Sequence, residues 1–136
     1  MTQPVHDLAS NPVHLGLGAK AIVQPAMTGM EWYEAYAQRT ATDGKEGRLV
    51  SLHSFTADWE GWEMHPLGDE LVVCIAGEIV LIQEDPAGAL HRETLTAGQY
   101  LINPAGIWHT ADVATNATAL FITAGQDTRH RPRNAT

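Results

Sequence analysis

Cysteine is almost absent from this chain of 136 residues, which contains only Cys74. A single cysteine excludes an internal disulfide framework and a zinc site built from several cysteines. Basic residues are also few: eight lysines and arginines stand against sixteen aspartates and glutamates, which gives a formal net charge of −8. A protein that follows a nucleic-acid backbone needs a basic surface, so we expect no nucleic-acid partner.

Long apolar runs are missing as well. No stretch of the sequence is long enough to span a bilayer, and we expect no membrane partner. The first residues carry neither the basic start nor the apolar stretch of a secretory signal, so we expect a cytoplasmic protein. With 44% hydrophobic and 18% charged residues, the composition is that of an ordinary globular protein with one core.

The N-terminal part of the chain, residues 1–27, is interrupted by three prolines and two glycines, which argues against a long regular element. We expect an arm there, with short extended pieces such as residues 21–23. The Thr-x-x-Glu spacing from Thr28 to Glu31 then predicts a capping box, which opens a helix that continues to Arg39.

Beyond residue 47 the sequence predicts short strands that alternate with turns rich in glycine, proline and asparagine. Many short strands at close, regular spacing favour an all-β sandwich or barrel. The expected strands cover residues 49–55, 62–65, 71–76, 79–84, 91–95, 100–103, 109–113 and 118–123.

Four residues in this part carry metal-ligand chemistry: Glu63, His65, Glu70 and His109. Glu63 and His65 are two residues apart on one predicted strand, so their side chains point to the same face. Glu70 opens the next strand after a turn, and His109 follows a second turn. If these strands face a common interior, two imidazoles and two carboxylates meet there. Such a set suits a divalent manganese, iron, nickel or zinc ion.

The spacing around these residues resembles the two motifs of the cupin superfamily. The first motif corresponds to Glu63-x-His65, four residues, Glu70, six residues and Gly77. The second corresponds to Gly98, five residues, Pro104-Ala105-Gly106, two residues and His109. The resemblance covers residues 47–125. It implies a small antiparallel, double-stranded β-barrel of the cupin or jelly-roll type, preceded by an arm and one short helix (1–46) and followed by a tail (126–136).

The sequence departs from the family pattern at three positions. Ala57 replaces the opening glycine and Val113 the final asparagine, which are turn or packing positions. Glu63 replaces the first metal-binding histidine, whereas by resemblance His65, Glu70 and His109 keep the other three ligands. Two carboxylates and two neutral imidazoles around a divalent ion sum to zero charge, where the usual set leaves one positive charge.

Glu63 has two interpretations. It is either a fourth metal ligand or a catalytic general base beside a centre of two histidines and one carboxylate. Without metal, we expect one of the two neighbouring carboxyl groups to have a raised pKa, because both ionise together only at a cost.

The resemblance implies a pocket for a small molecule and, in many family members, a homodimer, for which residues 1–27 are candidates. Three functions are compatible with these features of the sequence. The first is a metal-dependent enzyme on a small polar molecule, of the dioxygenase or the isomerase or lyase type. The second is a non-catalytic binding or sensor protein. The third is a structural sandwich with a vestigial pocket.

Several other residues have two interpretations. His53 is either a structural histidine, the favoured interpretation, or part of the pocket wall. Trp59, Trp62 and Trp108 either wall the pocket or pack between the sheets. Cys74 is expected to be a small buried hydrophobe. No role is expected for His14 in the arm or for His130 in the basic tail.

Overall fold

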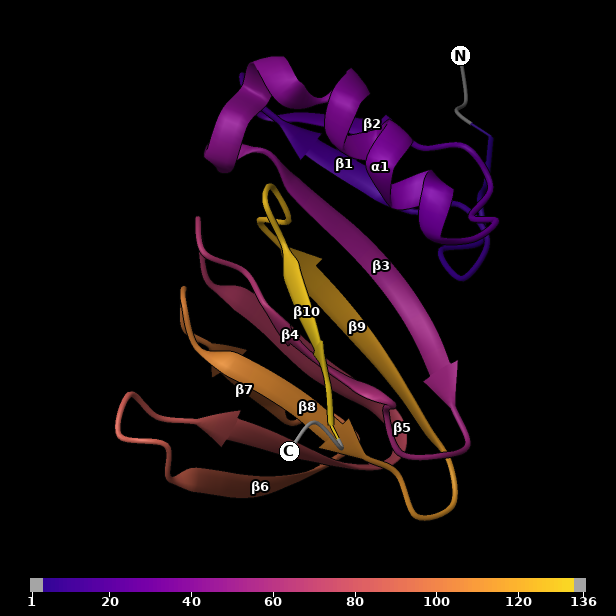
Figure 1. Cartoon of the computed structure of the whole chain (residues 1–136). Helices are drawn as coiled ribbons and strands as arrows, with labels where there is room; N and C mark the ends of the chain where they lie inside the picture. The colour runs from indigo at the N-terminus through magenta and orange to yellow at the C-terminus, as the bar shows by residue number, and fades with distance from the viewer. Residues whose placement is uncertain (1–3, 134–136) are drawn as a thin grey trace.

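The structure, a computed structural model, describes residues 4–133 (Figure 1). Over this range the chain forms ten strands, one α-helix and one 3-10 helix. In chain order the elements are β1 (Val13–Gly16), β2 (Lys20–Val23), α1 (Met30–Arg39), η1 (Ala41–Glu46), β3 (Arg48–Phe55), β4 (Gly61–Met64), β5 (Glu70–Glu84), β6 (Leu90–Thr96), β7 (Tyr100–Asn103), β8 (Trp108–Asp112), β9 (Ala117–Thr123) and β10 (Arg129–Pro132).

The strands form two antiparallel sheets that share β5. The first sheet has the order β2-β1-β3-β9-β5-β7, and the second has the order β10-β4-β8-β5-β6. The path of hydrogen-bonded strands runs from β10 to β2 without closing. The all-β jelly-roll architecture that the sequence predicts is therefore confirmed, with the sheets packed as an open sandwich.

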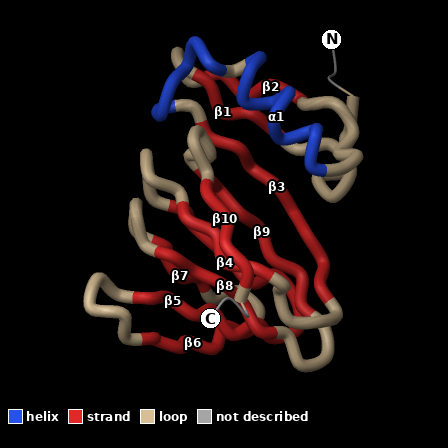
Figure 2. The backbone as a smooth tube through the Cα atoms, in the orientation of Figure 1, coloured by secondary structure: helices blue, strands red, loops and turns tan. Residues whose placement is uncertain are grey.

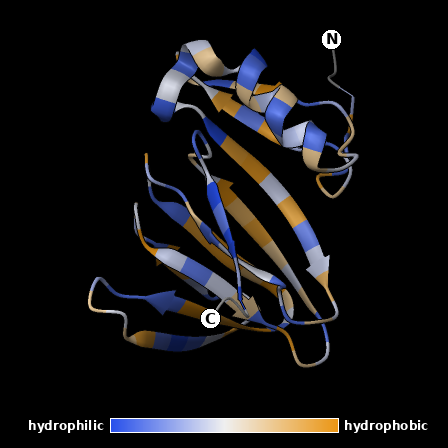
Figure 3. Cartoon of the chain, in the orientation of Figure 1, coloured by the Kyte–Doolittle hydropathy of each residue, from blue (hydrophilic) through white to orange (hydrophobic). Residues whose placement is uncertain are grey.

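The hydrophobic core lies between the two sheets. Along β3 apolar and polar residues are mixed (Figure 3), and the two buried positions, Leu49 and Ser51, are two residues apart and therefore share one face of the strand. Cys74 belongs to the core, as predicted, and burial raises the pKa of its thiol. The buried members of the core are Val72, Cys74, Ile79, Leu81, Leu95, Ala111, Val113, Ala117, Ala119 and Phe121.

The prediction of a turn at Gly77 is wrong. The expected strands 71–76 and 79–84 are one continuous strand, β5, which extends from Glu70 to Glu84. Up to Gly77 this strand pairs with β9, and from Glu78 onward it pairs with β6, with a register shift between Cys74 and Ala76. Gly77 has a φ of +74°. The glycine therefore marks a bend where one strand passes from the first sheet to the second, and the chain does not reverse there.

The helix expected after residue 28 is present, but the predicted capping box is not. Helix α1 begins at Met30, its N-cap is Gly29, and no side chain caps it. The hydroxyl of Thr28 instead donates to the Glu31 carboxylate, at 3.2 Å. Thr28 therefore lies one residue too early to be the N-cap.

The N-terminal arm contains more regular structure than the sequence predicts. The extended piece expected at residues 21–23 lies in β2, which pairs with an additional strand, β1. This hairpin, α1 and η1 lie together at one end of the sandwich (Figures 1 and 2). Nε2 of His14 donates to the Asp43 carboxylate at 2.7 Å, and Nδ1 lies 2.6 Å from the hydroxyl of Tyr36. His14 thus links β1, α1 and η1, although the sequence suggested no role for it.

No helix among residues 4–133 combines the length and the apolar character that crossing a membrane requires.

Candidate metal centre

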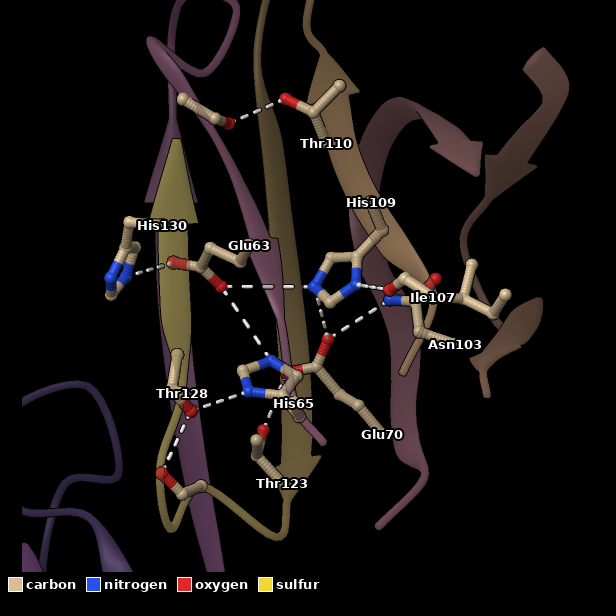
Figure 4. Close-up of polar contacts among 12 residues, drawn as sticks. Glu63, His65, Glu70, Asn103, Ile107, His109, Thr110, Thr123, Thr128 and His130 are labelled. Carbon is tan, nitrogen blue, oxygen red and sulfur yellow. Dashed lines mark hydrogen bonds and ion pairs between the residues drawn. The ribbon is translucent and has the colours of Figure 1, made fainter. Parts of the chain in front are cut away.

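The four predicted ligand residues converge between the two sheets (Figure 4). Glu63 lies on β4 and His65 directly follows this strand; Glu70 is the first residue of β5 and His109 lies on β8. Glu63 and His109 are direct partners in the β4–β8 pairing. The two-residue period of a strand brings the side chain of His65 to the same face as that of Glu63.

Glu70 lies between the two imidazoles. Nε2 of His65 is 3.2 Å from one Glu70 oxygen, and Nε2 of His109 is 3.2 Å from the other. Glu63 is more loosely placed, with one carboxylate oxygen 3.8 Å from Nε2 of His65 and 3.9 Å from Nε2 of His109. The side chain of Glu63 is 35% exposed, whereas that of Glu70 is 4% exposed. Glu63 is therefore the ligand candidate that solvent or a bound molecule can reach.

Backbone and hydroxyl groups behind the histidines fix the direction of their ring nitrogens. The Thr128 hydroxyl donates to the carbonyl of Gly125, so it accepts from Nδ1–H of His65 at 2.7 Å. Nδ1–H of His109 donates to the carbonyl of Ile107 at 3.4 Å. When neutral, both imidazoles therefore direct an Nε2 lone pair toward the centre, the tautomer that binds a metal.

These two Nε2 atoms are buried and make no hydrogen bond of good geometry, although each lies 3.2 Å from an oxygen of Glu70. Buried polar atoms without a partner are uncommon in proteins and need a physical reason. One ligand atom from each of Glu63, His65 and His109 lies within 4.8 Å of the other two, so these three residues could hold a metal ion. The donor set of imidazole nitrogen and carboxylate oxygen fits a divalent transition metal.

Glu70 is held in place by two hydrogen bonds from the first sheet. The amide of Asn103 donates to Oε1 at 3.0 Å, and the hydroxyl of Thr123 donates to Oε2 at 2.6 Å (Figure 4). Partners of this kind orient a carboxylate toward a metal. Asn103, Thr123 and Thr128 were not among the predicted site residues, because their role depends on tertiary contacts between distant strands.

The electrostatics of the centre correct one expectation. Burial favours a raised pKa for both carboxyl groups, but the neighbouring imidazoles outweigh it. They lower the pKa of Glu63 to about 2 and also lower the pKa of Glu70. Burial by itself favours a lower pKa for His109, but Glu63 and Glu70 raise the pKa of this residue to about 9. The expected raised carboxyl pKa is wrong because an imidazolium compensates the paired carboxylates.

The C-terminal segment also contributes to the centre. The sequence predicts no strand there, yet β10 pairs with β4 and brings Nε2 of His130 to 3.6 Å from Glu63. Glu63 raises the pKa of His130. Arg131 of β10 forms an ion pair with Glu84 at 2.6 Å, which links β10 to β5. Its guanidinium group also lies over the rings of Trp62 and Trp108. These two tryptophans therefore pack against the C-terminal segment.

A cavity of about 830 Å³ opens beside the centre, with Glu63, His65 and Glu70 among its lining residues. Helix α1 contributes to its wall, and His53 and Trp59 line it as well. His53 therefore lines the pocket, which is the alternative interpretation of this residue, and its ring also packs against Phe121. Burial lowers the pKa of His53, which keeps its imidazole neutral near pH 7.

No protein-family profile matches the sequence, and no curated protein matches it. Solved structures are similar in fold. An oxalate oxidase matches with a TM-score of 0.55 and 17% identity, over 68% of this chain and 49% of its own. The chain thus spans about half the length of that protein.

Two further neighbours have TM-scores of 0.48. A cupin superfamily protein from Desulfitobacterium hafniense is 26% identical, over 56% of this chain and 65% of its own. A cupin-2 domain protein from Shewanella frigidimarina is 20% identical, over 56% of this chain and 69% of its own. At 17% identity the similarity to the oxalate oxidase concerns the fold alone, and it agrees with the antiparallel β-sandwich that the sequence predicts.

Proposed function

We propose that the protein binds a divalent transition metal through Glu63, His65, Glu70 and His109 and acts as an enzyme on a small molecule in the adjoining cavity. The observation that carries this proposal is the pair of buried Nε2 atoms of His65 and His109, which make no hydrogen bond of good geometry and lie within 3.9 Å of the carboxylates of Glu63 and Glu70. A divalent ion in this position would act as a Lewis acid that orients an oxygen-bearing substrate. Dioxygenase and isomerase or lyase chemistry both use such a centre.

The two carboxylates have different roles in this proposal. Glu70 is fixed by Asn103 and Thr123, so it serves as a rigid ligand. Glu63 has only contacts of 3.6 to 3.9 Å, and its side chain is partly exposed. It can therefore accept a hydrogen bond from a bound molecule. His130, whose side chain is 52% exposed, is placed to exchange a proton between Glu63 and solvent.

Metal analysis tests the proposal directly. Protein expressed without metal supplementation is expected to contain about one divalent transition metal per chain, because the four donors make one complete set. The measurement is elemental analysis against protein concentration, followed by removal and re-addition of the metal. A chain that neither retains nor rebinds manganese, iron, nickel or zinc would contradict the proposal. Metal and tight ligand binding without turnover would instead favour the sensor function.

Replacing Glu63 by alanine separates its two roles. We expect Glu63→Ala to weaken metal affinity by at least about 10-fold, because the loss of one of four ligand groups should cost no less than the loss of a residue that only orients a ligand. The affinity is measured by competition with a chelator. Glu60→Ala is the matched control, since Glu60 also lines the cavity but does not belong to the ligand set. Unchanged affinity with lost turnover would assign Glu63 the role of general base and remove it from the ligand set.

Metal binding is expected to release about one proton per chain near pH 7.5. The pKa of His109 is about 9 in the metal-free site, so its imidazole is protonated at this pH and must lose the Nε2 proton to bind a metal. Glu63, with a pKa of about 2, is already ionised. Apparent affinity should therefore fall about tenfold per pH unit below pH 9 and level off above it.

Calorimetry in buffers of different ionisation enthalpy measures the number of released protons. The variant His91→Ala serves as a control, because the side chain of His91 is 60% exposed and pairs with Asp85, which does not belong to the ligand set. Its proton release should equal that of the unmodified chain. Metal binding with no proton release at pH 7.5 would show that His109 is neutral in the metal-free protein.

A further inference from the structure

The cavity has an aromatic wall beside the metal centre. Phe55, Trp59 and Phe121 form a continuous cluster, with ring centroids 5.5 Å apart for Phe55 and Trp59 and 6.0 Å apart for Trp59 and Phe121. The ring of His53 adjoins this cluster at 5.8 Å from Phe121. All four residues line the cavity. Such a wall favours a flat ring as its occupant, because aromatic rings attract one another in tilted and offset arrangements.

The charged groups that line the cavity are mainly acidic. Within residues 4–133 no lysine or arginine lines it, whereas five acidic residues do: Glu34, Glu60, Glu63, Glu70 and Asp127. A divalent ion would balance Glu63 and Glu70. It would leave Glu34, Glu60 and Asp127 without compensation, so the field in the cavity disfavours an anion.

Three arginines of neighbouring elements, Arg39, Arg131 and Arg133, are engaged with other groups. Arg39 donates to the side chain of Gln24 and lies over the ring of Trp32. Arg131 and Arg133 are paired with Glu84 and Asp112. The imidazoles do not replace them: burial lowers the pKa of His53, and any charge on His130 faces the Glu63 carboxylate. A carboxylate or phosphate on a bound molecule would therefore find no free cationic partner on the cavity wall.

The polar groups at the inner end of the cavity are mostly acceptors. Carboxylate oxygens accept hydrogen bonds and cannot donate them. A hydroxyl on the bound molecule can donate to Glu63 and still present a lone pair to a metal. The volume of about 830 Å³ lies within the range of pockets that hold small organic molecules.

We infer that the cavity binds a hydroxylated aromatic molecule that carries no anionic group, with its hydroxyl directed toward Glu63 and the metal centre. This inference deepens the proposed function and rests on it for the role of the metal. Recognition of the ring and rejection of anions depend on the cavity wall alone.

The experiment compares 4-hydroxyphenylacetamide with 4-hydroxyphenylacetate by titration calorimetry, on the full chain with its metal content measured. The two probes have nearly the same size and differ in charge. We expect the amide to bind at least about tenfold more tightly, because the acid has no cationic partner. The saturated analogue 4-hydroxycyclohexylacetamide should bind about three- to tenfold more weakly than the aromatic amide.

Two variants of the same helix provide a matched test of the charge effect. Glu34 lines the cavity, whereas Glu31 does not and instead accepts from Thr28; both are exposed residues of α1. Glu34→Lys should strengthen binding of 4-hydroxyphenylacetate about fivefold, and Glu31→Lys should leave it unchanged. Neither substitution disturbs the core, so both variants should fold.

The outcomes separate this inference from the proposed function. Preference for the amide in protein that binds no metal would support the inference and contradict the metal proposal. Equal or tighter binding of the acid, equal binding of the saturated analogue, or no binding of either aromatic probe by metal-loaded protein would overturn the inference and leave the metal proposal standing.

Discussion

Replacement of His109 by alanine is expected to abolish stoichiometric metal binding. His109 is 1% exposed, and its Nε2 atom lies 3.2 Å from Glu70 and 3.9 Å from Glu63. Losing this nitrogen removes one of the two imidazole donors in the set. Changes to residues that merely orient a ligand lower affinity roughly 10- to 100-fold, and loss of a buried ligand itself should exceed about 100-fold.

The same substitution should also destabilise the metal-free protein. Without the His109 imidazolium, the buried Glu70 carboxylate keeps the neutral donors Asn103 and Thr123 and the neighbouring His65 imidazole, but loses one of its two imidazole partners. Removing one partner of a buried charge pair typically lowers the free energy of unfolding by about 3–5 kcal/mol. His109→Gln keeps a side chain that can donate to Glu70, so it should fold better while still losing the metal.

Metal content and urea unfolding, measured on both variants, test this prediction. The control is His91→Ala, which removes an exposed histidine beside Asp85 and should change neither quantity. If His109→Gln folds and retains one tightly bound metal per chain, then His109 is not a ligand. The centre would in that case consist of Glu63, His65 and Glu70.

The strands near the centre could be predicted from the sequence because local pattern determines them. Expected and observed boundaries of β7 agree, β3 and β9 begin one residue earlier than expected, and β4 and β8 are shifted by one residue at both ends. Period-two alternation also predicts that Glu63 and His65 share a face. Their distances to Glu70 and His109 confirm the convergence of the four residues, although the metal itself remains a proposal.

The parts that could not be predicted depend on long-range contacts. His130 lies beside Glu63 only because β10 returns to pair with β4, and no local pattern in the short basic segment indicates this pairing. The pKa values of the centre depend on which imidazole lies near which carboxylate. Counting the two carboxylates alone predicts a raised carboxyl pKa, whereas the neighbouring imidazoles lower the pKa of both Glu63 and Glu70. His53 and Trp59 line the cavity because of the way that β3 and the following loop curve around it.

At Gly77 the sequence indicates correctly that the backbone is unusual, but the predicted turn is wrong, because Gly77 lies at a bend within β5. Glycine at position 77 indicates an unusual backbone conformation, which the φ of +74° confirms. A hairpin turn and a bend within one strand both use such a glycine. Only the pairing partners on each side, β9 before Gly77 and β6 after it, distinguish the two.

Replacing Gly77 by alanine is expected to be strongly destabilising. A Cβ atom at this position would lie 2.2 Å from the carbonyl oxygen of Asn116, which is backbone and cannot rotate away. That oxygen also accepts from the amide of Glu78 at 3.2 Å, so relieving the clash would disturb this hydrogen bond. The positive φ alone costs an L-residue about 1–2 kcal/mol. With the clash, we expect the free energy of unfolding to fall by about 4 kcal/mol or more.

Gly88→Ala provides the matched control. Gly88 has a φ of +88°, but a Cβ atom added there would meet nothing within 4 Å, so alanine at this position carries only the conformational cost. Denaturant unfolding should therefore give a loss about 2–3 kcal/mol smaller for Gly88→Ala than for Gly77→Ala. Similar losses for both variants would mean that the strand relaxes freely around residue 77. In that case the contact between residue 77 and Asn116 would not fix the bend of β5 between the sheets. The position of Glu70, the first residue of β5, would then not depend on this contact.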